Sequence, residues 1–231
     1  MEKHITLTNT KAISRFLQLL DGSFPNGAFV HSFGLEPHII LEKVSDRLEL
    51  KTFLENLIID QYCNFDFVFI RNIYKYFTKN QLDLIIREDN FFSARLPYEY
   101  AKASQDIGEN YLKQINFSIT SSIVKKYFDS VANKHSKGNE LCILSAYAYE
   151  IGLNVDTLLL FWAKKNIINI AMTSLKISKI TPSQIQQTLF ELDDILIDYI
   201  NNTSKEIGIF NPLFEEIIHQ HHKLEPKLFT T

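Results

Sequence analysis

The stretch FLQLLDGSFPNGAFVHSFGLE, residues 16–36, places three glycines and one proline in an otherwise largely apolar segment. The whole chain holds only seven glycines and six prolines, so this concentration indicates a sharp change of chain direction. Gly22 follows an amphipathic pattern at the position where a left-handed helix cap is favoured. Residues 24–27, FPNG, fit a type I turn with proline second and glycine fourth. We therefore expect two helices joined by a rigid corner, the second of them ending near residue 36.

The polar residues of this corner divide into two groups. Asp21 and Ser23 can cap exposed backbone groups, which is a common role of these residue types in turns. His31, Ser32 and Glu36 are not explained by the turn alone. His31 fits either a buried, hydrogen-bonded residue that holds the corner together or a residue with a functional role.

Apolar residues recur at helical spacing along most of the chain, and strand signals are poor. One helix has a clear start, because Thr181 can cap it, Pro182 fits its first position and Gln184 completes a capping box. Its apolar series comprises Ile185, Leu189, Leu192, Leu196 and Tyr199. The sequence therefore predicts an all-α protein with a single compact multi-helix domain over residues 1–203.

Residues 204–231 form a second predicted region, a C-terminal helix followed by a short docking tail. Asn211 can cap the helix and Pro226 should end it. Leu228 and Phe229 then stand close to the terminus, where residues are usually polar and frayed. Two apolar side chains at this place suggest that the tail docks onto a partner.

The composition argues against several classes of partner. The formal net charge is −3, whereas phosphate-dominated binding of nucleic acid needs a clustered positive surface. No apolar run reaches the length that spans a membrane. Cys63 and Cys142 stand far apart, so we expect reduced thiols and a cytoplasmic location.

The motifs of common enzyme classes are missing from the sequence. It has no phosphate-binding loop of the form G-x-x-x-x-G-K-[ST], no G-x-S-x-G and no H-E-x-x-H. His219 and His222 would share a helix face, but two histidines make a weak metal site without a third ligand. We therefore predict no catalytic residue, no metal ligand and no bound cofactor. The alternative is a small all-α metal-dependent enzyme that uses His31, Glu36 and the C-terminal histidines.

Residues 17–36 resemble the N-terminal signature of the UreF family of urease accessory proteins, which is close to L-Q-L-x-D-S-x-x-P-x-G-x-F-S-H-S-x-G-L-E. Val30 and Gly22 stand where the family usually has serine. The matching residues are Asp21, Pro25, Gly27, Phe29, His31, Ser32, Gly34, Leu35 and Glu36.

Three shorter stretches resemble later parts of the same family pattern, in the expected order. Ala101 and Lys227 stand where the family usually has arginine. The matching residues are Glu99, Ala103, Ser104 and Gly108 in the first stretch, Thr181 and Gln184 in the second, and Pro212, His221, Leu228 and Phe229 in the third.

The resemblance implies an all-α homodimer without catalytic activity of its own. Such proteins bridge a UreG-type GTPase to a UreD-type protein, also called UreH, and so to apo-urease. The complex uses GTP hydrolysis to insert nickel into the urease active site, so the complex handles the metal. The candidate partner-binding residues are Asp21, Pro25, Gly27, His31, Ser32, Gly34, Glu36, Glu99, Ser104, Gln184, His221, Lys227, Leu228 and Phe229.

Overall fold

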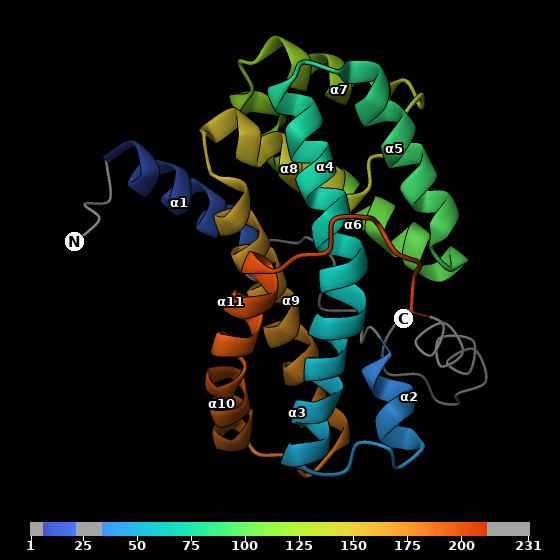
Figure 1. The fold of residues 1–231 in the computed structure, drawn as a ribbon, viewed down its shortest axis with the longest axis vertical. Helices are drawn as coiled ribbons and strands as arrows, with labels where there is room; N and C mark the ends of the chain where they lie inside the picture. Colours follow the sequence, from blue (N-terminus) through green and yellow to red (C-terminus); the bar gives the residue numbers. More distant parts are fainter. Residues whose placement is uncertain (1–6, 22–33, 212–231) are drawn as a thin grey trace. The chain divides into compact units, whose positions relative to one another are not determined.

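Helices are the only regular elements in residues 7–21 and 34–211, the parts of the chain that the computed structural model describes (Figure 1). The prediction of an all-α protein is therefore confirmed. None of these described helices combines the length and the apolar character that a membrane span requires.

The chain forms two compact units. Residues 1–26 and 69–161 make up the first unit, and residues 27–68 and 162–231 make up the second. The predicted division between residues 1–203 and 204–231 concerns a different boundary and stays a prediction.

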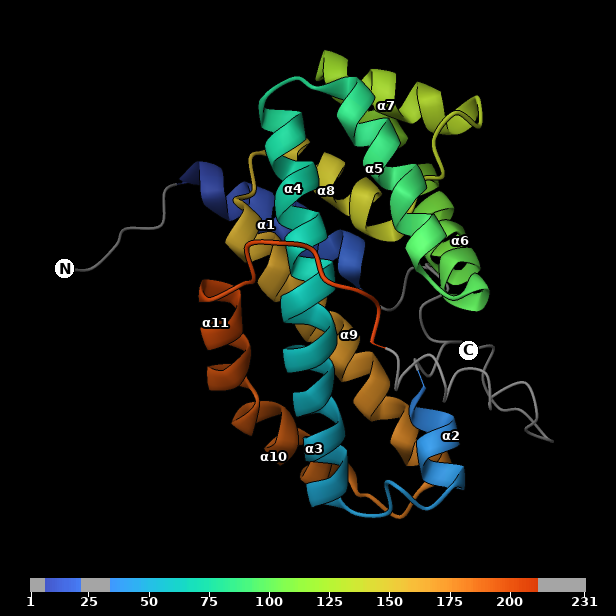
Figure 2. The same cartoon turned by 45° about the vertical axis from the view of Figure 1, so that its right-hand side comes forward.

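The first unit is built around a nearly apolar helix, α8. Residues 140–148 of this helix are all buried, which is expected of a helix that is apolar on every side. Helix α6 lies along it, and α1 and α7 also pack against it (Figures 1 and 2). The elements with residues in this unit are α1 (Leu7–Leu20), α4 (Phe67–Thr78), α5 (Leu82–Arg95), α6 (Tyr98–Ile115), the 3-10 turn η3 (Asn116–Ser118), α7 (Ser122–Ala132), α8 (Glu140–Ile151) and the start of α9 (Val155–Ile177).

A carboxylate lies in the interior of the first unit. Asp89 of α5 is fully buried, and its Oδ2 accepts hydrogen bonds from Tyr127 Oη (3.1 Å), Ser136 Oγ (2.7 Å) and the Gly138 amide (2.7 Å). Its Oδ1 accepts from the Asn139 amide (3.1 Å) and Asn139 Nδ2 (2.7 Å). A buried charge is tolerated when donors satisfy it in this way. The five bonds fix the loop between α7 and α8.

The phenol of Tyr127 remains a donor in this cluster. Burial first, and then the Asp89 carboxylate, raise the pKa of Tyr127 well above its ordinary value. The hydroxyl therefore keeps the proton that it donates to Asp89 across the physiological pH range.

The second unit contains the predicted capping box and two differences from prediction. The single helix expected to carry Ile185 to Tyr199 is in fact two helices, which are separated at Leu192. Gln184 N donates to Thr181 Oγ1 and Thr181 N donates to Gln184 Oε1 (2.8 Å), which confirms the predicted helix start. A helix begins at Leu35, directly after Gly34, whose φ of 83° is not helical, so the helix expected to end near Glu36 does not run through Gly34. Residues 28–33 of that predicted helix lie outside the described residues. The elements are α2 (Leu35–Ile40), α3 (Arg47–Asn56), η2 (Leu57–Asp66), the rest of α9, α10 (Pro182–Glu191) and α11 (Asp193–Asn201).

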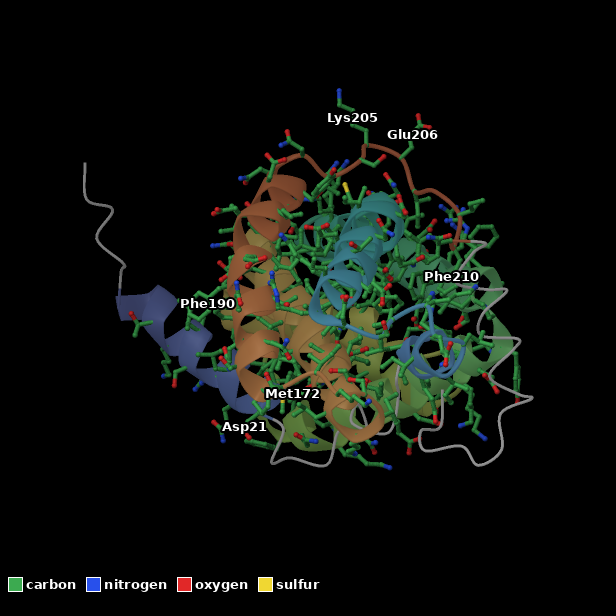
Figure 3. All side chains as sticks on the ribbon, turned by 90° about the horizontal axis from the view of Figure 1, so that it is seen from below. Asp21, Met172, Phe190, Lys205, Glu206 and Phe210 are labelled. Atoms are coloured by element: carbon green, nitrogen blue, oxygen red, sulfur yellow. The ribbon has the colours of Figure 1, made fainter. Side chains whose placement is uncertain are left out.

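Element η2 is a ten-residue π-helix, a form that is rare at this length. The segment after α11, drawn in red in Figure 1, is hydrogen-bonded to it. The Gly208 amide donates to the Asn64 carbonyl (2.8 Å), and the Asn211 amide donates to Gln61 Oε1 (3.0 Å). The start of the predicted tail is therefore held on η2. In Figure 3 the side chains of Lys205 and Glu206, in this segment, point away from the helices.

We expect Asp89→Asn to destabilise the protein strongly. Whichever way the amide is oriented, its NH₂ group faces at least two of the donors that Asp89 now satisfies, and each buried donor without an acceptor costs about 1–3 kcal/mol. The free energy of unfolding, measured by urea denaturation, should therefore fall by about 2–5 kcal/mol.

The matched control for this prediction is Asp83→Asn, an exposed position in the first turn of the same helix. This change removes a favourable interaction with the helix dipole and should cost about 1 kcal/mol or less. Equal effects of the two substitutions would show that the buried cluster contributes no special stability.

Candidate functional site

The motif residues on α6 face the start of α8. Ala103 is buried, and Ser104 Oγ accepts a hydrogen bond from the Glu140 amide (3.2 Å). Glu140 is the first residue of α8, and a helix start has backbone amides without an intrahelical acceptor. Ser104 therefore caps α8 from a neighbouring helix, which gives this motif residue a structural role.

Gly108 brings two stretches of backbone into direct contact. A Cβ atom at Gly108 would lie 2.0 Å from the Gly138 carbonyl oxygen and 3.1 Å from the Glu140 nitrogen, so a side chain has no room here. Gly138 itself has φ +71°, a conformation that side chains disfavour. We call the set Asp89, Ser104, Gly108, Gly138, Asn139 and Glu140 the α6–α8 junction.

Further hydrogen bonds tie α5 to the same junction. Ser93 Oγ donates to Asn139 Oδ1 (3.0 Å), and Gln105 Nε2 donates to Ser93 Oγ (3.2 Å). No sequence motif marks Ser93, Gln105 or Asp89 as members of this junction. Helical spacing could have predicted that Asp89 is buried, because Asp89 shares a face of α5 with the buried residues Ile85 and Phe92.

Ala101 is buried one turn before the junction, at the position where the family usually has arginine. A methyl group here fills space within the first unit and makes no ionic contact. This chain therefore lacks the family's charge at a buried point of α6. Glu99, the other motif residue, lies in the first turn of the same helix and is partly buried.

In the second unit, three polar or backbone groups lie at the start of α2. They belong to Gly34, Glu36 and His38. Glu36 is fully buried, and His38 Nδ1 lies 2.6 Å from the Gly34 carbonyl oxygen. Because a carbonyl only accepts, Nδ1 carries the proton. The imidazole also meets the Phe53 ring edge-on at 4.7 Å. Burial, opposed in part by the Gly34 hydrogen bond, lowers the pKa of His38, so the ring is neutral at pH 7.

The remaining candidate residues are not gathered at one place. Asp21 follows the end of α1 and is exposed (Figure 3), and Gln184 is an exposed capping residue of α10. Asp21, Glu99 and Ser104 belong to the first unit, whereas Gly34, Glu36 and Gln184 belong to the second. The candidates that lie outside the described residues are Pro25, Gly27, His31, Ser32, His221, Lys227, Leu228 and Phe229.

Among the described residues, no three His, Cys, Asp or Glu side chains approach one another closely enough to hold a metal ion. The alternative prediction is a metal-dependent enzyme that uses Glu36, His31 and the C-terminal histidines. Glu36 is buried in α2, and the histidines lie outside the described residues. The polar groups of the α6–α8 junction bind one another, the backbone and the side chains of Ser93, Tyr127 and Ser136. These hydrogen bonds hold helices together.

Comparison with known proteins gives a consistent family match. The family model of UreF matches residues 44–193. The chain is 23% identical to the urease accessory protein UreF of Bacillus sp. (strain TB-90), over 92% of this chain and 96% of that protein. It is 26% identical to the protein of the same name from Lachnoclostridium phytofermentans, over 94% of this chain and 97% of that protein.

We expect Gly108→Ala to destabilise the chain although alanine is the better helix former. In an unobstructed helix this change would stabilise by about 1 kcal/mol. Here the new methyl meets backbone that has no rotamer to change, and such overpacking costs about 1–3 kcal/mol. Chemical denaturation should show a net loss of stability and a changed near-UV signal.

Gly152→Ala is the control for this prediction. It measures the cost of an unfavourable backbone conformation without a steric clash. Gly152 has φ +71° but open space around its Cβ position, so its replacement should cost about 1–2 kcal/mol without disturbing the junction. A gain of stability in Gly108→Ala would contradict the close contact with Gly138.

The lowered pKa of His38 predicts a pH-dependent contribution to stability. As the pH falls below the unfolded value of 6.5, the unfolded state takes up the proton first, so the free energy of unfolding decreases towards the folded pKa. The slope contributed by one such group is at most about 1.4 kcal/mol per pH unit. Urea denaturation between about pH 7 and pH 5 should show a smaller loss in His38→Gln. Parallel curves for the two proteins would contradict the prediction.

Proposed function

Because the chain belongs to the UreF family of urease accessory proteins, we propose that it bridges a UreG-type GTPase to a UreD/UreH-type protein during urease maturation. In this role it regulates the GTPase and performs no chemistry of its own. Nickel is the cargo of the assembled complex and is not firmly bound by this chain.

The observation that carries this proposal is the extent of the family match. The family model covers the middle of the chain, and both named relatives align over more than nine-tenths of it. Both relatives are urease accessory proteins by name. The chain is therefore an accessory protein and not an enzyme, and a role in urease maturation follows from its family.

Exposed aromatic and apolar side chains support partner binding. Tyr98 and Phe117 of the first unit are 83% and 90% exposed, and Phe190 of the second unit is 75% exposed (Figure 3). The cores of protein interfaces are enriched in aromatic residues. We propose that these surfaces contribute to a homodimer and to contacts with the other accessory proteins.

The C-terminal tail is the proposed contact for the UreD/UreH-type partner. The tail starts from a fixed point, because the Asn211 amide donates a hydrogen bond to Gln61 Oε1 of η2. Residues 212–231 follow this attachment and include His221, Lys227, Leu228 and Phe229. A fixed starting point lowers the entropy that the tail loses when it binds a partner.

The cytoplasm is the proposed location. Cys63 and Cys142 are both free and buried, and the fold holds them as thiols in separate units. Burial also raises the pKa of the Cys142 thiol well above its usual value, which makes this group unreactive. Both features suit a reducing compartment.

Deletion of residues 224–231 tests the proposed function. Burial of one Leu or Phe side chain against a partner contributes about 1.5–3 kcal/mol, which corresponds to about one to two decades of affinity. The truncated chain should keep its helical circular dichroism and its oligomeric state but lose most of its capture of the UreD/UreH-type protein in a pull-down.

The control is Lys227→Ala in the full chain, which removes a charge that keeps only part of the geometry of the family's arginine. It should weaken capture less than the deletion. Full capture by the truncated chain would show that the tail is not the contact. Loss of helical signal would show instead that the tail belongs to the folded core.

A further inference from the structure

A groove of about 590 Å³ lies in the first unit between α6 and the loop that joins α7 to α8. No residue of the α6–α8 junction apart from Gly138 lines it, so it is a separate surface beside that junction. The groove is lined by Lys102, Gln105, Asp106, Glu109, Leu112, Lys113, Asn116, Val131, Ala132, Lys134, Ser136, Lys137 and Gly138.

The two walls of the groove differ in charge. On the α6 wall each lysine pairs with an acid one turn away, Lys102 with Asp106 and Lys113 with Glu109 (2.7 Å). On the loop wall Lys134 and Lys137 are exposed, and neither forms an ion pair with another residue of the described parts of the chain. The groove therefore carries excess positive charge in a protein whose net charge is −3.

The loop that carries these two lysines is held in place by hydrogen bonds. The buried Asp89 carboxylate binds Ser136 Oγ and the Gly138 amide, on either side of Lys137. Asn90 Nδ2 donates to the His135 carbonyl (2.9 Å), next to Lys134. The lysine backbones are thus ordered before any ligand arrives, which lowers the cost of binding.

The length of the groove fits a short extended peptide. From Lys102 to Lys113 the axis of α6 advances about 16 Å at about 1.5 Å per residue. An extended chain covers that distance in about five residues. Leu112, Val131 and Ala132 add apolar surface on which a side chain of the peptide can pack.

We propose that this groove binds an extended acidic segment of the UreG-type GTPase, with carboxylates of that segment paired to Lys134 and Lys137. The inference rests on the bridging role proposed above, which requires two separate surfaces. The tail that is assigned to the UreD/UreH-type protein starts in the second unit, whereas the groove lies in the first. The groove is therefore distinct from the start of the tail and can serve as the surface for the GTPase.

The pairing of charges on the α6 wall favours a peptide over a free phosphate. Asp106 and Glu109 are already paired with Lys102 and Lys113, so the excess positive charge is confined to Lys134 and Lys137 and does not extend across the whole groove. A peptide can place its carboxylates at Lys134 and Lys137 and turn amide hydrogens or apolar atoms towards these acids. Electrostatic complementarity of this kind selects a partner and orients it.

The test uses the full chain co-expressed with the GTPase and the UreD/UreH-type protein. The groove variant is Lys134→Glu with Lys137→Glu. Its control is Lys125→Glu with Lys126→Glu, which changes the net charge by the same amount. Both lysines are exposed residues of α7 in the same unit. The groove variant should capture roughly tenfold less GTPase or weaker still, because attraction becomes repulsion. It should keep the UreD/UreH-type protein, and the control should keep both.

A zero-length carboxylate-to-amine cross-linker gives a second readout on the unmutated complex. Lys134 or Lys137 should become joined to an Asp or Glu of the GTPase, as identified by mass spectrometry. Circular dichroism verifies the fold of each variant, and Lys137→Glu alone serves if the double variant does not fold. Absence of these cross-links from a complex that contains the GTPase would overturn the assignment.

The outcomes separate the groove from the bridging role. If the unmutated chain captures neither partner, the proposed function itself fails. If it captures both and the groove variant does so equally well, only the groove assignment fails. Equal losses in the groove and control variants would also overturn it, as would loss of the UreD/UreH-type protein alone. Calorimetric binding of inorganic phosphate that disappears in the groove variant would show an anion site in place of a peptide site.

Discussion

The buried Asp89 carboxylate is the interaction on which the first unit depends most. Its five hydrogen bonds all come from neutral donors on α7 and on the loop before α8. None of these donors is a lysine or an arginine, so the buried charge is stabilised by neutral hydrogen-bond donors alone. Helix α8 starts directly after this loop, and α6 packs against both. One side chain of α5 therefore holds the loop from which α8 starts and against which α6 packs.

The polar groups of this protein serve its assembly. Serine, asparagine and glutamine side chains at the α6–α8 junction bind backbone or one another, and the capping box of α10 does the same in the second unit. An accessory protein has to present surfaces in a fixed arrangement, and these internal bonds provide that. The family's pattern on α6 then has a physical meaning, because Ala103, Ser104 and Gly108 allow close packing and cap a neighbouring helix.

The sequence predicted what depends on neighbouring residues and missed what depends on distant ones. The all-α class and the capping box at Thr181 follow from spacings of three and four residues. The second helix predicted in the opening stretch does not run through Gly34, because the φ of 83° at this residue outweighs the apolar pattern around it. The Asp89 cluster joins residues 38 to 50 positions apart, so no local pattern reveals its partners. Element η2 was also missed, because the helical spacing of its apolar residues does not distinguish a π-helix from an α-helix.

The contact between Gly108 and Gly138 has a consequence for how such a surface can evolve. The spacing between α6 and the loop is set there by main chain against main chain, with no side chain in between. Substitutions among the exposed residues of the two walls therefore alter charge and shape while the width between the walls is preserved. Replacement of a lysine by glutamate or by an apolar residue on these walls would change which partner the groove prefers, while the contact between the two glycines would keep the spacing of the walls.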